Sequence, residues 1–475
     1  MTLPDSAASR AVLEEAASRA VLDEAASRAV GYAATVAARR VFPDAPALAG
    51  LAVFDEPLPD GPSDPAATLR LLDEAGSPAT VASAGADYYG FVTGGTHPAA
   101  LGAAWLTSAW DQNAALPVMS PVAARLHSVV QGWVTELLGL PHGTELAFVT
   151  GATMANATAL AAARDTVLAR AGWDVQGRGL FGAPEIAVVV GERVHTTLLK
   201  ALGLVGLGRE RVHVVPADCA GRMRAELLPG LLAGHRGPVI VCAQAGEVNT
   251  GSFDPFDAIA DWAAAHEAWF HVDGAFGLWA LADPSRAALV RGLDRADSWA
   301  TDAHKWLNVT YDSGMVLVRE PGALRRSFFA AAAYLPGDAD GEVEAMHRTP
   351  QTSQRARVVE VWAVLRTLGR EGVARLVAES SDHARLIAER LRSGGLEVLN
   401  DVVLNQVLVR GEDDRTTTAL LAAVHADGRL WCGPTVWDGA PAMRLSVSSW
   451  RTTAADAARA ADVVLELAGR LRSGG

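Results

Sequence analysis

Two residues that lie far apart in the sequence, Asp273 and Lys305, point to one kind of chemistry. Asp273 ends the apolar, β-rich segment 268–273 and is followed by Gly274 and Ala275, which are small enough for a flat group to lie close. Lys305 is the penultimate residue of the segment SWATDAHKW. A lysine amine can form a Schiff base with an aldehyde, and a carboxylate can keep a pyridine nitrogen protonated so that the ring accepts electrons. The pair therefore predicts a site for pyridoxal 5'-phosphate (PLP).

Each of these residues taken alone has an ordinary explanation. An aspartate at a strand end usually forms a turn or caps a helix, and a lysine usually lies on the surface. However, Lys200 and Lys305 are the only lysines among 41 basic residues. A lysine in an arginine-dominated chain indicates a need for an amine that can lose its proton, which a guanidinium cannot do.

At the motifs HVDGAFG and TDAHKWLN the sequence resembles the PLP-dependent group II amino-acid decarboxylases, which include aromatic amino-acid, histidine and glutamate decarboxylases. The resemblance extends from about residue 85 to the C-terminus. It implies that Lys305 forms the Schiff base and that Asp273 pairs with the pyridinium nitrogen. It also implies a homodimer with its site at the subunit interface. The implied reaction converts an L-amino acid, most commonly an aromatic one, to an amine and carbon dioxide.

The segment FVTGATMAN ends a predicted strand and begins a predicted helix. Gly151 permits the tight turn, and the first backbone N–H groups of the helix, with the Thr153 hydroxyl, can bind an anion. Such a turn is by itself an ordinary helix cap. Beside the Asp273 and Lys305 motifs it resembles the phosphate cup of the family, with Ala152 and Thr153 as contacts.

The resemblance implies further contacts to the cofactor. His195, in GERVHTTLLKALG, corresponds to a histidine that stacks on the ring and contributes to proton transfer, although a histidine after a strand is more often structural. Ala275 would lie against the ring, and His304 would pack or bond near the phosphate. Asp302 is a further predicted contact; with Ala303 it stands where aromatic decarboxylases commonly have Asn-Pro.

The segment 88–95 (YYGFVTGG) resembles the substrate side of the family's site, with Phe91 and Thr93 as substrate contacts, although its aromatic residues could equally belong to the core. Glu247 stands where close members usually have asparagine. Its carboxylate could select a cationic substrate or simply point to solvent. Arg444 matches an arginine of the small domain to which we assign no role.

The polar segment 335–354 is predicted to be a mobile lid. In the family this lid carries a tyrosine that protonates the reacting carbon after carbon dioxide leaves. Here that position falls near Met346, with His347 adjacent and Tyr334 upstream. His347 could replace the tyrosine as the acid. Family members with phenylalanine at this position instead form aldehydes by oxygen-dependent oxidative deamination. That reaction, or another carbon–carbon lyase reaction, is the alternative, and a catalytically silent PLP-binding scaffold is a third.

The elements that must position these residues follow from the hydrophobic pattern. Residues 97–372 alternate between apolar runs such as EIAVVV and helical segments, which predicts α/β architecture with a mainly parallel sheet sandwiched by helices. The resemblance implies the fold-type I arrangement with seven strands. Residues 373–475 predict a small C-terminal α/β domain, and residues 1–96 predict an N-terminal helical and dimerisation segment.

A nine-residue repeat (AASRAVLEE) occupies residues 7–34. Nine residues make two and a half helical turns, so successive copies present valine and leucine on opposite faces. This predicts a helix that is covered on more than one side, as expected for the family's N-terminal helices, which pack across a dimer. A recent duplication with no role is the alternative.

Composition narrows the classes of partner. The net charge of −13 argues against nucleic acid or an anionic membrane. Three widely spaced cysteines give neither a disulfide framework nor the spacing of metal ligands, so we expect no metal. The sequence shows no apolar run long enough to span a bilayer and no signal core, and we expect a cytoplasmic enzyme.

Overall fold

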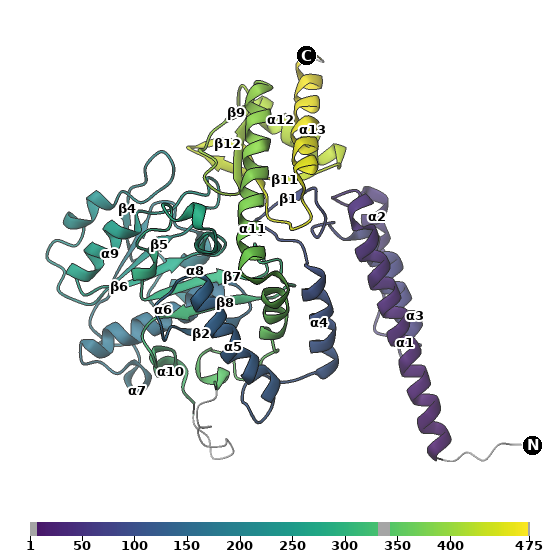
Figure 1. The fold of residues 1–475 in the computed structure, drawn as a ribbon, viewed down its shortest axis with the longest axis horizontal. Coiled ribbons are helices and arrows are strands. Elements are labelled where there is room, and N and C mark those ends of the chain that lie inside the picture. Colours follow the sequence, from purple (N-terminus) through teal and green to yellow (C-terminus); the bar gives the residue numbers. More distant parts are fainter. Residues whose placement is uncertain (1–6, 331–342, 474–475) are drawn as a thin grey trace, which may run out of the picture.

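The computed structural model describes residues 7–330 and 343–473. Two β-sheets organise the chain, and the long helix α11 (Val358–Ser393) connects the larger part to the smaller one (Figure 1). Gly369, with φ of 62°, interrupts this helix with a kink. Helix α11 continues across residue 372 without a break in the chain. The domain boundaries at 96/97 and 372/373 stay a prediction.

The larger sheet has seven strands in the order β2-β8-β7-β6-β5-β3-β4. The strands from β4 to β7 are parallel, whereas β8 runs antiparallel to both β7 and β2, so the prediction of a mainly parallel sheet is confirmed. The strands are β2 (Glu145–Val149), β3 (Ala187–Gly191), β4 (Val212–Val215), β5 (Val239–Gln244), β6 (Trp269–Asp273), β7 (Ser298–Asp302) and β8 (Gly314–Val318).

Helices cover both faces of this sheet, and each face has its own core. Val188, Val190 and Ile240 pack with the first set of helices, whereas Val189 and Val241 face the second. Both faces are apolar, which is why the strands lack the alternation of a half-exposed sheet. The first set is α6 (Ala152–Arg170), α8 (Thr196–Leu204) and α10 (Ala323–Phe328); the second is α4 (Pro98–Trp110), α5 (Pro121–Leu137), α9 (Phe256–Ala265) and α11; a short α7 (Val175–Arg178) follows α6.

The smaller sheet has the order β1-β11-β12-β10-β9. Its strand β1 comes from the predicted N-terminal segment, and Tyr88 and Tyr89 pair in parallel with Trp431 and Cys432 of β11. The sequence had predicted neither β1 nor β11. The elements are β1 (Tyr88–Tyr89), β9 (Glu397–Val398), β10 (Gln406–Arg410), α12 (Asp414–Asp427), β11 (Trp431–Trp437), β12 (Ala440–Ser446) and α13 (Ala454–Ser473).

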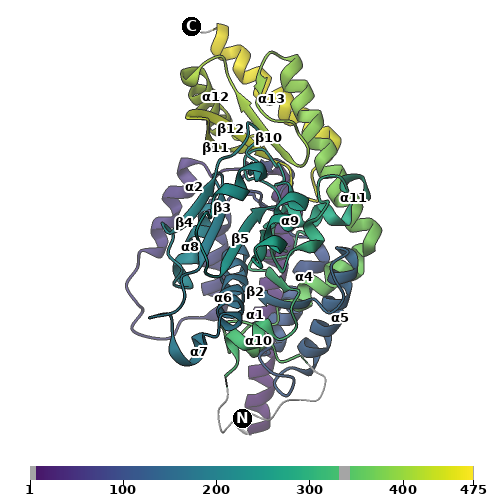
Figure 2. The same ribbon diagram turned by 90° about the vertical axis from the view of Figure 1, so that its left-hand side faces the viewer.

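The N-terminal helices α1 (Ala7–Thr35), α2 (Ala45–Gly50) and α3 (Pro65–Leu71) form an arm beside the body (Figures 1 and 2). Arg28 of α1 ties the arm together, since it bonds Glu24 at 3.0 Å and Asp73 at 2.8 Å. Leu22 is 69% exposed, so this chain alone does not cover α1 on several sides. No described helix combines the length and the apolar character needed to cross a membrane.

Candidate active site

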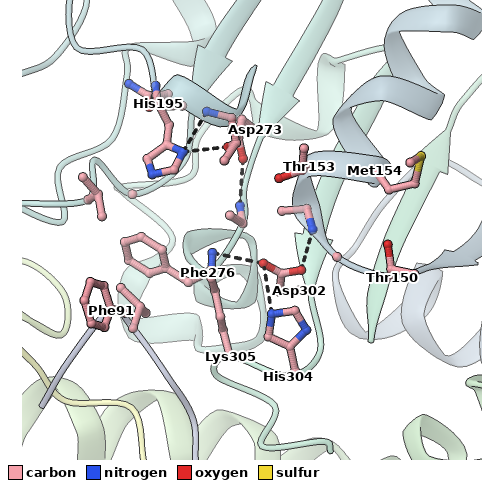
Figure 3. Close-up of a pocket in the computed structure, with 18 of the residues that line it drawn as sticks. Phe91, Thr150, Thr153, Met154, His195, Asp273, Phe276, Asp302, His304 and Lys305 are labelled. Atoms are coloured by element: carbon pink, nitrogen blue, oxygen red, sulfur yellow. Dashed lines mark hydrogen bonds and ion pairs between the residues drawn. The ribbon is translucent and has the colours of Figure 1, made fainter. Parts of the chain in front are cut away.

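A cavity of about 440 Å³ opens where β5, β6 and β7 end and α6 begins (Figure 3). Among its walls are all the predicted site residues except Thr93 and His347. These are Phe91, Ala152, Thr153, His195, Asp273, Ala275, Asp302, His304 and Lys305.

Lys305 lies three residues beyond the end of β7, and its Nζ is 3.0 Å from Asp302 Oδ2. The other carboxylate oxygen of Asp302 accepts a hydrogen bond of 2.6 Å from the backbone N–H of Ala152. Asp302 therefore joins the lysine to the first turn of α6. Gly94 packs against the backbone here, because a Cβ at this position would lie 1.8 Å from the Lys305 carbonyl oxygen.

Asp273, the last residue of β6, is buried at the opposite side of the cavity. Its Oδ1 accepts from the Ala275 N–H at 3.1 Å and its Oδ2 from Asn156 Nδ2 at 2.9 Å. Burial raises the pKa of Asp273, whereas His195 and Lys305 act in the opposite direction. Sequence reasoning did not identify Asn156, whose place four residues into α6 carries no motif signal of its own.

The first turn of α6 faces the cavity through Ala152, Thr153 and Met154. The cap residue is Gly151, which has no side chain to occupy the N–H groups of this turn. Space also requires glycine nearby, since a Cβ on Gly314 would lie 2.5 Å from the Gly151 Cα. This helix start therefore offers backbone donors and the positive end of the helix dipole to an anion.

His195 caps α8 on the far side of the cavity from Lys305 (Figure 3). Its Nδ1 accepts from the Thr197 N–H at 3.3 Å and lies 2.6 Å from the Thr197 hydroxyl, and its backbone N–H donates to Gln244 at 3.1 Å. Burial lowers the pKa of His195, which favours a neutral ring.

His304 is fixed by its neighbours. Its ring stacks on Tyr311 with centroids 4.1 Å apart, and its Nδ1 accepts from the Ser313 N–H at 3.2 Å. Burial lowers the pKa of His304, and Asp302 opposes this effect from 3.6 Å away. A neutral imidazole therefore lies beside the lysine.

A family model described as the pyridoxal-dependent decarboxylase conserved domain matches residues 83–410. The chain belongs to this family. An L-2,4-diaminobutyrate decarboxylase of Rhizobium meliloti (strain 1021) is 30% identical over 79% of this chain and 76% of that protein. An aromatic-L-amino-acid decarboxylase of Bacillus atrophaeus is 26% identical over 71% of this chain and 69% of that protein.

The fold agrees with this assignment. The crystal structure of Oryza sativa TDC with PLP and tryptamine superimposes with a TM-score of 0.87 at 22% identity, covering 99% of this chain and 100% of that one. The protein is a PLP-dependent carboxy-lyase of fold-type I, as the sequence predicted. Its cavity fits the cofactor chemically, because it combines a lysine amine, a buried carboxylate and the start of a helix.

In the segment predicted to form the substrate side, Phe91 and Val92 line the cavity with φ of 51° and 56°. The Phe91 ring stacks on Trp431 at 5.2 Å. Thr93 is not among the lining residues, and its hydroxyl instead bonds that of Tyr88, whose pKa burial raises to about 12. The aromatic residues of this segment therefore divide between the two predicted places: Phe91 faces the cavity, whereas Tyr89 is fully buried in the core.

Glu247 corrects both of our expectations, because it neither lines the cavity nor points to solvent. It is buried and accepts hydrogen bonds of 2.7 Å from the backbone N–H groups of Asn249 and Thr250. Burial raises the pKa of Glu247, and these bonds act against the rise. Its role is to hold the turn that follows β5.

Arg444, to which the sequence assigned no role, lines the cavity from β12. Its side chain is buried, and among the described residues its Nε has no hydrogen-bond partner. One guanidinium nitrogen donates to Asn249 Oδ1 at 3.4 Å. An arginine within the otherwise apolar run AMRLSV was the signal that could have identified it.

The predicted lid is described only from residue 343; Tyr334 and residues 335–342 lie outside the described residues. His347 is buried at 3.4 Å from Glu344, and its ring lies 4.8 Å from that of Phe329. It does not line the cavity of its own chain. Met346 packs with Ala115 and Leu116. The role of His347 as an acid stays a prediction.

Proposed function

We propose that this protein decarboxylates an L-amino acid with a large apolar, preferably aromatic, side chain to its amine and carbon dioxide. The observation that carries the proposal is the meeting of Lys305, Asp273 and the start of α6 in one cavity. The substrate class rests on the walls near Phe91, which include Val92, Val248 and Phe276.

The charges of the cavity support the same choice. Its carboxylates are Asp273 and Asp302, and each already accepts a backbone or side-chain donor of the chain. A cationic side chain such as that of diaminobutyrate would find no uncommitted anion among the lining residues. Arg444 remains as the partner for the carboxylate of an amino acid.

The residues have separate tasks in this proposal. Lys305 would carry PLP, Asp273 would hold the pyridine nitrogen protonated, and the start of α6, with Ala152 and Thr153, would bind the phosphate. When bound, PLP supplies the ring that accepts the electron pair as carbon dioxide leaves. His195, as a neutral imidazole in the cavity wall, would pack on the ring. Asp302 would hold the free Lys305 amine whenever the lysine is not bonded to the cofactor, since the two groups are 3.0 Å apart.

A decarboxylating oxidative deaminase is the second candidate, and Met346 is the observation that favours it. In the family this position carries the hydroxyl that protonates the reacting carbon. A thioether has no proton to give, so only His347 or water could replace it. Without a proton donor, reaction of the amino acid with oxygen and water would yield an aldehyde, carbon dioxide, ammonia and hydrogen peroxide.

One experiment separates the two reactions. PLP-loaded protein would be incubated with pooled L-amino acids in air and without oxygen, and products identified by mass spectrometry. Equal amine formation in both atmospheres supports decarboxylation, whereas aldehyde and peroxide formed only in air support the second candidate. Lys305→Ala must abolish both the cofactor absorbance and turnover; retention of both would contradict the site.

Two further parts of the proposal concern the whole protein. We propose a homodimer, because α4 and the N-terminal arm expose apolar side chains that include Leu22, Trp105 and Leu106. We also propose a cytoplasmic location, consistent with three free cysteines, of which Cys242 and Cys432 are buried.

A further inference from the structure

A row of buried polar side chains leads from the core to Asp273. Trp269 and His271 belong to β6, Ser298 to β7 and Asn156 to α6, and all four are fully buried. We propose that these four residues form a positioning chain that fixes the orientation and the ionised state of the Asp273 carboxylate. The inference rests on the proposed role of Asp273 toward PLP.

Four contacts connect the chain without a gap. Trp269 Nε1 donates to Ser298 Oγ at 2.8 Å, and Ser298 Oγ lies 2.9 Å from His271 Nδ1. His271 Nε2 lies 2.9 Å from Asn156 Oδ1, and Asn156 Nδ2 donates to Asp273 Oδ2 at 2.9 Å.

The chemistry of its two ends gives this chain a single direction. The indole N–H of Trp269 can only donate, and an ionised carboxylate can only accept. Asn156 donates its N–H to Asp273, so its oxygen must accept a hydrogen bond from the N–H of His271 Nε2. His271 Nδ1 is then an acceptor for the Ser298 hydroxyl, whose oxygen accepts from Trp269. Only this direction satisfies every group.

A neutral His271 suits that arrangement, because Nδ1 without a proton can accept a hydrogen bond from the Ser298 hydroxyl. Burial lowers the pKa of His271 to about 3, which keeps the ring neutral throughout the physiological range. The tautomer is fixed by Ser298 on one side and by Asn156 on the other.

The burial of Asp273 explains why such a chain is useful. Burial alone raises the pKa of Asp273 and favours the protonated form, which could not stabilise a pyridinium. The N–H groups of Asn156 and Ala275 bind the charged form instead. Asn156 is thus the last donor of a chain that lies behind Asp273, and none of its four members lines the cavity.

Ordinary packing does not require this arrangement. Thr158, two residues farther along α6, is equally buried, and its hydroxyl has no hydrogen-bond partner among the described residues. A buried hydrogen-bonded pair can be replaced by apolar groups of the same shape at little cost. Three elements nevertheless direct polar groups in series toward one oxygen of Asp273, which favours a positioning role.

The test uses the full-length apo protein, into which PLP is titrated while the cofactor absorbance is followed. Asn156→Ala removes a hydrogen bond to a charged group and should weaken PLP binding roughly 10-fold or more. Ser298→Ala touches neither Asp273 nor the cavity and should weaken it in the same direction by about 3-fold, since His271 loses the partner that fixes its tautomer. Thr158→Val is the matched control and should bind PLP as the wild type does.

A second readout separates positioning from stability. The acid limit of PLP binding is the pH below which the protein no longer binds PLP. In Asn156→Ala this limit should move to higher pH, because a carboxylate that has lost a donor protonates more readily. The other groups facing Asp273, namely His195, Lys305 and Cys242, are unchanged in this variant.

Two results would overturn the inference: PLP binding by Asn156→Ala and Ser298→Ala equal to that of Thr158→Val, or an unchanged acid limit. If Asn156→Ala does not fold, Ser298→Ala decides the question alone, because it removes only one oxygen. If the wild type itself fails to bind PLP, the proposed function has failed rather than the positioning chain.

Discussion

At the scale of single residues, Arg444 is the group whose environment most clearly demands a ligand. Its guanidinium is buried in the cavity wall, and its Nε has no partner among the described residues. Burial lowers the pKa of Arg444, and Glu247 partly offsets this effect. A buried cation with so few partners is costly unless an anion binds, and the carboxylate of an amino acid is such an anion.

Arg444→Met should therefore raise KM and lower kcat/KM by roughly 10- to 100-fold, which corresponds to losing hydrogen bonds to a charged group. The cofactor absorbance should persist, because Lys305 and Asp273 are untouched. Steady-state kinetics on the substrate found by product analysis would check this. Arg410→Met on β10, which removes bonds to the carbonyl groups of Trp437 and Pro441, is the control and should leave KM unchanged.

Motif residues at strand ends were predictable from the sequence, whereas partners brought together by packing were not. Asp273 and Lys305 stand in recognisable motifs that locate them without coordinates. The pairing of Asn156 with His271 depends on how α6 lies on β6, and 115 residues separate the two. Glu247 was misjudged for the same reason, since its carboxylate turns back onto its own loop.

At the scale of elements, the segment 90–95 holds Lys305 in place. It follows β1, which joins the smaller sheet, and it crosses the backbone of the lysine at Gly94. The sequence missed this connection because β1 is only two residues long. Its partner β11 carries Gly433 and Pro434, and both residue types are depleted in strands.

Gly94→Ala tests the importance of this crossing. The new Cβ would lie 1.8 Å from the Lys305 carbonyl oxygen and 3.2 Å from that of His304, and backbone cannot move aside as a side chain can. We expect a loss of about 1–3 kcal/mol or more of stability, with weaker PLP binding. Thermal unfolding and PLP titration would measure both effects.

Gly102→Ala provides the comparison. This glycine lies within α4, and its added Cβ would meet nothing within 4 Å. Alanine is the better helix former, so the variant should be more stable by about 0.5–1 kcal/mol with unchanged PLP binding. Equal behaviour of the two variants would show that the crossing at Gly94 has no special role.

At the scale of the whole molecule, buried histidines make stability depend on pH. The ring of His127 is buried between α5 and β2, where its Nε2 donates to the Leu146 carbonyl at 2.8 Å. Burial lowers the pKa of His127 from 6.5 to about 4. Between these values the unfolded chain binds more protons than the folded one, so stability falls as the pH drops from 6.5 toward 4.

The titration of His127 alone should make the free energy of unfolding about 2 kcal/mol smaller at pH 5 than at pH 7. His127→Gln keeps a donor for the Leu146 carbonyl but removes the titration, so the loss of stability on acidification should shrink by that amount. His213→Gln, at an exposed position on β4, is the control for the substitution itself. Urea unfolding at pH 7 and pH 5 would measure this change. An equal loss of unfolding free energy on acidification for the wild type and both variants would contradict the assignment.

The exposed apolar surface is the argument for assembly. On α4, Trp105, Leu106 and Trp110 are exposed, and Val118 and Met119 follow in the next segment. Such a concentration is unusual on the surface of a monomer, and it supports the proposal that this surface contacts a second copy of the chain. The repeat in α1 supports the same view, because two of its side chains, Leu22 and Val30, are exposed in the arm.

A homodimer with this contact would elute with twice the mass of one chain in size-exclusion chromatography with light scattering. Leu106→Glu places a charge in the middle of the contact and should shift the protein toward the monomer, since an unpaired charge is costly to bury. Leu204→Glu is the matched control, because Leu204 is 60% exposed and Leu106 is 54% exposed, yet Leu204 lies at the end of α8 on another part of the surface. A monomeric wild type, or a dimer that survives Leu106→Glu, would mean that the apolar face of α4 serves another partner.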